Sequence, residues 1–305
     1  FLFTLKKENF IIKNSKFTTD KVDFNSDLLK AVKKVDGYFV EGKIQNSESI
    51  LSNNLIKLLN LKDFNFDNSK FNSKSKFKFE INNKFRFKNL NIYSDINIKK
   101  IKFNNEIINS DYFVNTNKEI LLNNQNLKLN YENNILSIKG KGDIKFGKKS
   151  DKIEYFFVKN KNNYEFESNF NIKKIILKNH KFFKNYFPLT NDQINLKNHE
   201  INVKYKNNEL ILKGKGKIKI NKEFDYVSYS FNKNNDDFEI ISDIDLNNIS
   251  LRNKEFLKKF FPKTKDFLNL REHKVKIKYK KNYFSLSGQG KIKIDKDFDN
   301  INYFI

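Results

Sequence analysis

The stretch that decides the fold is LSIKGKGDIKF, residues 136–146, which returns twice further along the chain. It reappears as LILKGKGKIKI at residues 210–220 and as FSLSGQGKIKI at residues 284–294. Both steps are 74 residues long, without insertion or deletion. The chain therefore contains a tandem repeat, and a fixed period of this kind is typical of proteins built from one recurring supersecondary unit.

Landmarks outside this stretch keep the same 74-residue register. Tyrosines, serines, prolines and histidines recur at this spacing: Tyr131, Tyr205 and Tyr279; Tyr155, Tyr229 and Tyr303; Ser94, Ser168 and Ser242; Pro188 and Pro262; His199 and His273. We expect an array of three repeat units over residues 76–305. Residues 1–75 do not fit the register, and we interpret them as an atypical α+β cap or a diverged repeat, because terminal repeats commonly differ.

Apolar and polar residues alternate within each unit, which is the signature of β-strands. Residues 201–205 and 210–220 alternate in this way on either side of an Asn-rich link, which predicts a β-hairpin. We expect about four antiparallel strands per unit, with one apolar face and one Lys-bearing face. Short helices are predicted at residues 253–261, 180–187 and 109–113, and in the first part at 27–35 and 47–61, with a strand at 38–44.

The apolar faces of roughly a dozen strands are too large to leave in water, at about 25 cal/mol per Å². One short helix per unit cannot cover four strands. We therefore expect a mainly β fold: an elongated antiparallel repeat sheet, curled into a U-shaped groove or a partly closed barrel. The predicted groove lining consists of alternate apolar residues: Leu127, Leu129, Tyr131, Ile138, Ile144, Phe146, Val203, Tyr205, Leu212, Ile218, Ile220, Ile277, Tyr279, Leu286, Ile292 and Ile294.

Paired glycines fall on the same apolar face. They are Gly140 and Gly142, Gly214 and Gly216, and Gly288 and Gly290. Glycine at these positions removes side chains and lets a strand bend sharply. One interpretation is a barrel-type corner that the Phe-rich helix of the same unit packs; the other is a set of gaps that widen the groove. A phosphate loop is not indicated, because no helix follows these triplets.

Composition restricts the chemistry. The chain has no cysteine, and its histidines are His180, His199 and His273. Because His199 and His273 occupy equivalent repeat positions, we expect them to serve packing or turns. No nucleophile elbow, catalytic triad or nucleotide-binding motif is present. We therefore predict no catalytic residue, no metal, no cofactor and no enzymatic activity.

Charge favours an anionic partner. The formal net charge is +24, from 60 basic and 36 acidic residues, and such a field attracts acidic polymers and anionic lipid head groups. The arginines are only Arg86, Arg252 and Arg271. Since arginine is preferred for reading phosphates and bases, and the aromatic residues follow the apolar face, no specific nucleic acid is expected as a partner.

The repeated two-faced strands resemble a known family. The block at residues 168–175, its counterpart at 242–249 and the Gly-x-Gly strands are similar to AsmA-like proteins of the Gram-negative envelope, including the YhdP and TamB groups. The resemblance covers roughly residues 35–305 and includes the Leu-rich segment 47–61. It implies a bridge-like carrier whose apolar groove lets phospholipid acyl chains cross the periplasm. It also implies an inner-membrane anchor, which we expect before Phe1 because the chain does not open with Met.

The leading hypothesis is thus a lipid-binding or lipid-conducting envelope protein located in the periplasm, with a phospholipid or other acyl-chain lipid as partner. Two alternatives belong to different classes. One is a structural or adhesive β-repeat protein with a filled core. The other is a Lys-rich, non-specific binder of acidic polymers, which predicts steep salt dependence.

Overall fold

The computed structural model describes residues 2–6, 8–19, 22–51, 64–65, 69–104, 119–145, 149–161, 163–178, 187, 193–221, 223–235, 237–264, 266–294 and 296–305. The chain forms two compact units. Unit 1 comprises residues 1–105, 119–145 and 152–167, and unit 2 comprises residues 106–118, 146–151 and 168–305.

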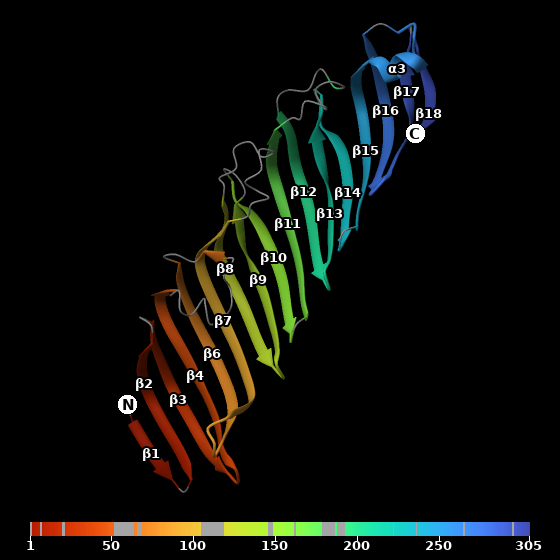
Figure 1. Cartoon of the computed structure of the whole chain (residues 1–305). Coiled ribbons are helices and arrows are strands. Elements are labelled where there is room, and N and C mark those ends of the chain that lie inside the picture. The colour runs from red at the N-terminus through yellow and green to blue at the C-terminus, as the bar shows by residue number, and fades with distance from the viewer. Residues whose placement is uncertain are drawn as a thin grey trace. The chain divides into compact units, whose positions relative to one another are not determined.

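Almost all described residues lie in long antiparallel strands, so the prediction of a mainly β fold is confirmed (Figure 1). The strands of the first part are β1 (Leu2–Lys6), β2 (Asn9–Thr19), β3 (Val22–Lys34), β4 (Gly37–Ile50), β5 (Phe64–Asn65), β6 (Lys70–Asn82), β7 (Phe87–Asn104), β8 (Glu119–Glu132), β9 (Ile135–Lys145) and β10 (Asp151–Asn160). The following strands are β11 (Asn163–Lys178), β12 (Gln193–Lys206), β13 (Glu209–Lys219), β14 (Asp225–Asn234), β15 (Asp237–Arg252), β16 (Phe267–Lys280), β17 (Tyr283–Lys293) and β18 (Phe298–Phe304).

Within each unit, strands that follow one another in the chain mostly lie side by side. In unit 1 the pairing runs from β1 to β4, then through β6 and β7 to β8 and β9. In unit 2 it runs from β12 to β18 without interruption. Among the described residues the sheet is antiparallel and not closed, and its curling into a groove or a partly closed barrel stays a prediction. Hairpins suffice to build such a sheet, because each strand finds its partner next in sequence.

Asparagine-rich turns join the strands, as the polar links predicted. Asn133 and Asn134 connect β8 to β9 with φ of 52° and 62°, and Asn207 and Asn208 connect β12 to β13 with φ of 50° and 66°. Two consecutive left-handed residues match the twist of a two-residue hairpin, and asparagine tolerates that conformation. These turns fix the register of the flanking strands, and therefore fix which side chains share a face.

A β-bulge recurs in β8, β12 and β16, near the end of each strand that lies away from the two-residue turns. Asn124, Asn198 and Glu272 have φ of 51°, 53° and 54°, and the pairing register shifts at each of them. Each bulge places two residues opposite one on the neighbouring strand. The bulge therefore reverses the alternation, and Leu122, Leu196 and Leu270 before it lie on the same apolar face as the odd-numbered residues after it.

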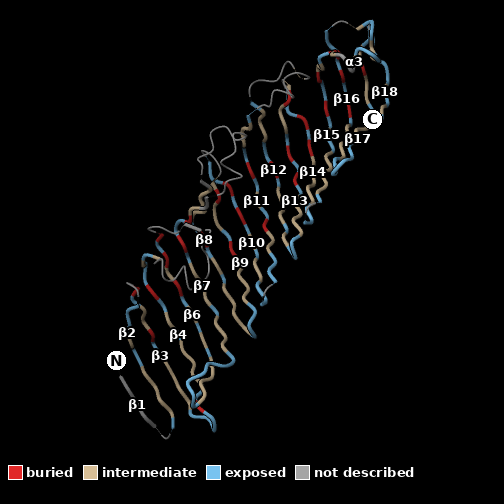
Figure 2. Tube along the Cα trace, in the orientation of Figure 1, coloured by how far each residue is buried: buried red, intermediate tan, exposed pale blue. Residues whose placement is uncertain are grey.

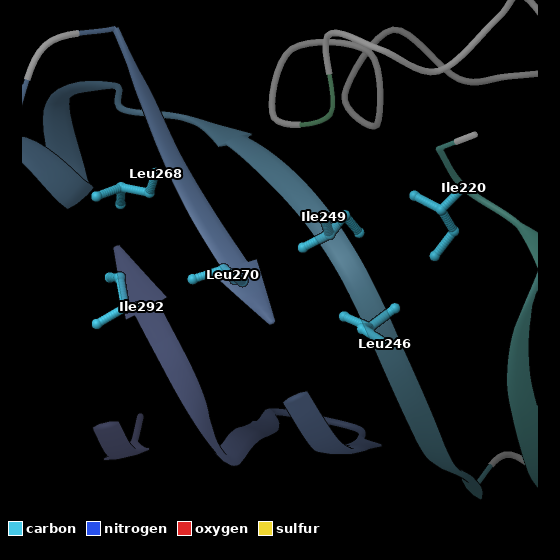
Figure 3. Packing of buried hydrophobic residues seen from close by; sticks show 6 residues of the cluster. All are labelled: Ile220, Leu246, Ile249, Leu268, Leu270 and Ile292. Atoms are coloured by element: carbon cyan, nitrogen blue, oxygen red, sulfur yellow. The ribbon is translucent and has the colours of Figure 1, made fainter. Parts of the chain in front are cut away.

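The single helix of the described residues, α3 (Glu255–Phe260), packs on the end of the sheet in unit 2. It confirms the helix predicted at 253–261, and Pro262 follows its end as expected. The Asn253 side chain donates hydrogen bonds to the Phe261 and Thr264 carbonyls at 3.1 and 3.0 Å and so holds this segment in place. Leu257 and Phe261 cover a cluster of six buried residues: Ile220, Leu246, Ile249, Leu268, Leu270 and Ile292 (Figure 3).

The first part of the chain departs from the predicted helices. Residues 27–34 lie in β3, so the helix predicted at 27–35 is wrong, whereas the strand at 38–44 is confirmed by β4. Leu28 and Leu29 are adjacent in β3 and therefore lie on opposite faces of the sheet, so both faces carry apolar side chains here and the strand lacks a simple alternation of apolar and polar residues. Strand β6 pairs directly with β4.

Three other predicted segments lie wholly or mainly outside the described residues. They are the helix at 109–113, the helix at 180–187 except for Phe187, and most of the helix at 47–61, whose first four residues belong to β4. The division into a cap at 1–75 and an array at 76–305 stays a prediction.

Candidate functional site

The apolar face is not uniform along the strands. Figure 2 shows that in unit 2 the buried stretches lie towards the ends of the strands near α3, whereas the hairpin ends are half-buried or exposed. The apolar face has three zones. One end of the strands is covered, the middle contains glycines, tyrosines and histidines, and an apolar row lies at the other end, next to the two-residue turns such as Asn207–Asn208; we call this the hairpin end.

The covered end is part of the protein's own core. Three predicted groove residues, Ile144, Ile220 and Ile292, are only 4%, 3% and 2% exposed. Ile220 and Ile292 belong to the cluster beneath α3, and Ile218 packs against it. In unit 1 a corresponding cluster of Val22, Phe71, Ile98 and Ile101 is joined by Leu127. These side chains pack against one another, so they do not line an open groove.

At the glycines of the middle zone, other side chains of the protein occupy the space that a Cβ would fill. A Cβ at Gly140, Gly214 or Gly288 would collide with the ring of Tyr155, Tyr229 or Tyr303 respectively. A Cβ at Gly142 would collide with the Gln125 amide, and at Gly216 or Gly290 it would lie 2.5 Å from the His199 or His273 ring. The expected groove-widening role of the six glycines is therefore wrong. They make room for the protein's own tyrosine, glutamine and histidine, which fill the space that the missing side chains leave.

Hydrogen bonds also join the seated side chains around Gln125 and His199, whereas the buried ring nitrogens of His273 have no hydrogen-bond partner among the described residues. Tyr155 donates to Gln125 Oε1 at 3.1 Å. In the next copy His199 Nδ1 lies 3.2 Å from the Tyr229 hydroxyl, and His199 Nε2 lies 3.1 Å from the Lys217 carbonyl. Burial raises the pKa of Tyr155 to about 12. Such buried polar pairs fix one arrangement of the middle zone, because each would cost stability if left unpaired.

The histidines predict a pH-dependent stability. Burial lowers the pKa of both His199 and His273, whereas an unfolded histidine has a pKa of about 6.5. As the pH falls, the unfolded chain therefore binds protons first, and stability is lost from about pH 6.5 down towards the folded pKa. We expect urea midpoints that are level between about pH 7 and 8 and that fall as the pH decreases below about 6.5.

Position 125 supplies the matched control, since glutamine occupies the equivalent place there. The double variant His199→Gln/His273→Gln should fold and should lose most of the decline below pH 6.5. If the double variant lost as much stability at low pH as the unmodified protein, the loss could not be assigned to His199 and His273.

The hairpin-end row of unit 2 crosses six neighbouring strands, from β12 to β17. Paired register positions place its side chains side by side on one face: Val203, Leu212, Phe231, Ile240, Tyr279 and Phe284. Tyr279 and Phe284 are 42% and 54% exposed, and the other four are half-buried. The adjoining Phe238 ring lies 5.5 Å from that of Tyr279. A row of this kind presents a continuous apolar strip, because no polar side chain interrupts the register.

The hairpin-end row of unit 1 crosses seven strands in the same manner. It consists of Ile12, Leu29, Gly42, Phe77, Ile92, Tyr131 and Leu136, all half-buried. The Leu29 and Phe77 side chains approach each other over Gly42. The two rows have the same character, although only the unit 2 row consists entirely of residues of the predicted array at 76–305.

The predicted lining residues separate into three groups. Those that lie in or beside the hairpin-end rows and stay partly exposed are Leu129, Tyr131, Ile138, Val203, Tyr205, Leu212, Ile277, Tyr279 and Leu286. Ile294 lies beyond the end of β17 and is 37% exposed, and Phe146 lies outside the described residues. Sequence reasoning missed Ile12, Leu29, Phe77, Ile92, Phe231, Ile240 and Phe284. Continuing the hairpin pairing outward from Leu212 would have found Phe231 and Ile240.

The opposite face carries the lysines, as predicted, but it also carries aromatic rings. Lys139 lies 5.7 Å from the centre of the Phe156 ring, and Lys197 lies 5.7 Å from that of Phe224. Arg271 lies 4.5 Å from the centre of the Phe298 ring. The expectation that aromatic residues follow only the apolar face is therefore wrong. Cation–π contacts at such exposed sites contribute about 0.5–1 kcal/mol each.

Comparisons of the chain with protein-family models, with curated proteins and with solved structures found no match. The described residues contain no helix with the length and apolarity needed to cross a bilayer. They also contain no group of three or more histidine, aspartate or glutamate side chains placed to hold a metal ion. The geometry of the two faces is therefore the basis for any functional argument.

Proposed function

We propose that the chain binds acyl-chain lipid along its hairpin-end rows, as a lipid-binding or lipid-conducting protein. The observation that carries the proposal is the partly exposed, uninterrupted apolar row of unit 2. Six strands at about 4.8 Å extend over roughly 24 Å. One acyl chain spans about 15 Å, half the hydrocarbon thickness of a bilayer, so a single chain fits within one row.

Charge beside the row suits an anionic head group. Lys233 pairs with Leu210 on one side and with Phe238 on the other, so it lies on the apolar face next to the row. Its side chain is exposed and has no ion-pair partner among the described residues. A phospholipid could place its chains on Phe231 and Ile240 and its phosphate near this ammonium group.

Several parts of the proposal rest on the family resemblance alone. These are transport between the inner and outer membranes, location in the periplasm, and an inner-membrane anchor before Phe1. Membership of the AsmA-like family is likewise proposed. The filled-core alternative predicts no bound lipid, and the acidic-polymer alternative predicts binding that depends on the Lys face.

The experiment is lipid extraction and mass spectrometry after purification in a mild, lipid-free detergent. The proposal predicts stoichiometric phospholipid or fatty acid, retained after gel filtration and lost in the double variant Ile12→Lys/Ile240→Lys. A delipidated sample should also rebind a fluorescent fatty acid. Absence of co-purified lipid together with failure to rebind the fatty acid would overturn the proposal and favour a filled core.

A further inference from the structure

A hollow lies on the Lys face of unit 1, opposite the apolar rows. It has a volume of about 660 Å³ and spans strands β3 to β10. Two neighbouring rows of side chains form it, and the backbone between them is its floor. One row contains Lys43, Lys76 and Tyr93, and the other contains Asp95, Lys128 and Lys139.

The hollow places like charges directly opposite each other. Lys43 pairs with Lys76 between β4 and β6, and Lys128 pairs with Lys139 between β8 and β9. Like charges in directly paired positions destabilise a sheet. None of Lys43, Lys76 and Lys128 has a carboxylate partner among the described residues. The Lys43–Lys76 pair therefore carries a cost that an anionic ligand would remove, whereas Asp95, directly opposite Lys128 on β7, offsets part of the cost of the Lys128–Lys139 pair.

The same face shows how such a pair holds a carboxylate. Glu48 accepts hydrogen bonds from Lys70, at 2.8 Å, and from Lys99, on the neighbouring strands β6 and β7. These two bonds lower the pKa of Glu48 to about 2. Two lysines on adjacent strands thus bind one carboxylate in this sheet, and the two pairs in the hollow offer the same arrangement without an internal partner.

The other lining groups indicate the kind of anion. Tyr93 and Phe156 leave 42% and 38% of their surfaces exposed at the hollow. Amide and hydroxyl side chains lie beside them: Asn25, Gln45, Asn130 and Ser137. Aromatic rings stack on the apolar faces of sugar rings, and amides and hydroxyls bind sugar hydroxyls. Asp95, which lies between Lys74 and Lys128, can accept hydrogen bonds from sugar hydroxyls.

We propose that this hollow binds a carboxylate-bearing polysaccharide, with Lys43 and Lys76 holding one carboxylate and Lys128 and Lys139 another. Tyr93 and Phe156 contact the sugar rings. The site is independent of the acyl-chain rows, because it lies on the other face and uses none of their residues.

Isothermal titration of the full chain with an oligogalacturonate tests the site, with a neutral maltooligosaccharide and an oligo-dT of similar length as comparison ligands. We expect saturable binding of the oligogalacturonate alone. The double variant Lys76→Gln/Lys128→Gln should weaken it at least tenfold, and Tyr93→Ala, which leaves the charge unchanged, at least threefold.

The matched control is Lys213→Gln/Lys276→Gln, which removes the same charge from the Lys face of unit 2. It should change affinity less than twofold. Equal losses in the two double variants would show a general charge effect and overturn the site. Binding of oligo-dT as tight as that of oligogalacturonate, or no binding of oligogalacturonate, would also overturn it. Circular dichroism shows whether each variant folds. If the lysine double variant does not fold, the affinity of Tyr93→Ala for oligogalacturonate tests the site instead.

Discussion

Ile12→Lys combined with Ile240→Lys should reduce affinity for a fluorescent fatty acid by at least tenfold. Both side chains lie in the hairpin-end rows, Ile12 in β2 and Ile240 in β15. Burying an isoleucine side chain against a ligand contributes about 1.5–3 kcal/mol, and placing an ammonium group in the strip adds a desolvation cost. A loss of 1.4 kcal/mol is already a factor of ten.

The neighbouring residues provide the control. Ile11 and Ile241 have the same side chain on the same strands but face the other way, opposite Lys30 and Ser230. Ile11→Lys/Ile241→Lys therefore makes the same chemical change on the Lys face and should alter affinity less than twofold. Equal effects of the two double variants on binding would show that the apolar rows have no special role.

Gly214→Val should lower the free energy of unfolding by about 1–3 kcal/mol, the usual cost of overpacking. A Cβ at this position collides with the Tyr229 ring, whose hydroxyl also lies 3.2 Å from His199 Nδ1. The ring must therefore move, and its polar contact is lost. Urea unfolding followed by circular dichroism measures the change.

Two comparisons show whether the collision is the cause. Lys213→Val, on the opposite face of β13, should change stability by less than about 0.5 kcal/mol. In the background Tyr229→Ala the additional cost of Gly214→Val should fall to near zero, because the obstructing ring is gone. An undiminished cost in that background would contradict the seating of Tyr229 over Gly214.

The alternation of side chains predicted much of this fold from sequence. Residues 201–220 indicate a hairpin with one apolar face, and the Asn207–Asn208 turn fixes its register. The helix before Pro262 was equally predictable, since a proline ends a run of aromatic residues at helical spacing. These features are local, so neighbouring residues alone determine them.

The role of the glycines depended on contacts that sequence spacing does not reveal. Gly214 and Tyr229 are on different strands, and only the pairing of β13 with β14 brings them together. The bulge at Asn198 likewise places Leu196 on the same face as His199 and Ile201, although simple alternation predicts opposite faces. The third copy, with Glu272 at the bulge, shows that no single residue type marks it. The helix predicted at 27–35 is wrong because apolar residues occupy both faces of β3 there, and the sequence alone does not distinguish this pattern from helical spacing.

The hollow on the Lys face was not predictable from composition. The excess of 60 basic over 36 acidic residues indicates a basic surface, but it does not say where charges oppose each other. Lys43 and Lys76 are 33 positions apart and meet only through the pairing of β4 with β6. The position of the aromatic rings on that face likewise depends on strand pairing, so the sequence alone did not predict it.

Photocrosslinking tests the central proposal most directly, namely that acyl chains lie along the hairpin-end rows. The protein would be loaded with a phospholipid carrying a diazirine near the end of one acyl chain, irradiated and digested. The modified peptides should contain Leu212, Phe231, Ile240 and Phe284, or their unit 1 counterparts Ile12, Leu29 and Phe77. Labelling confined to peptides of the Lys face, or no labelling above that of unfolded protein, would contradict the proposal.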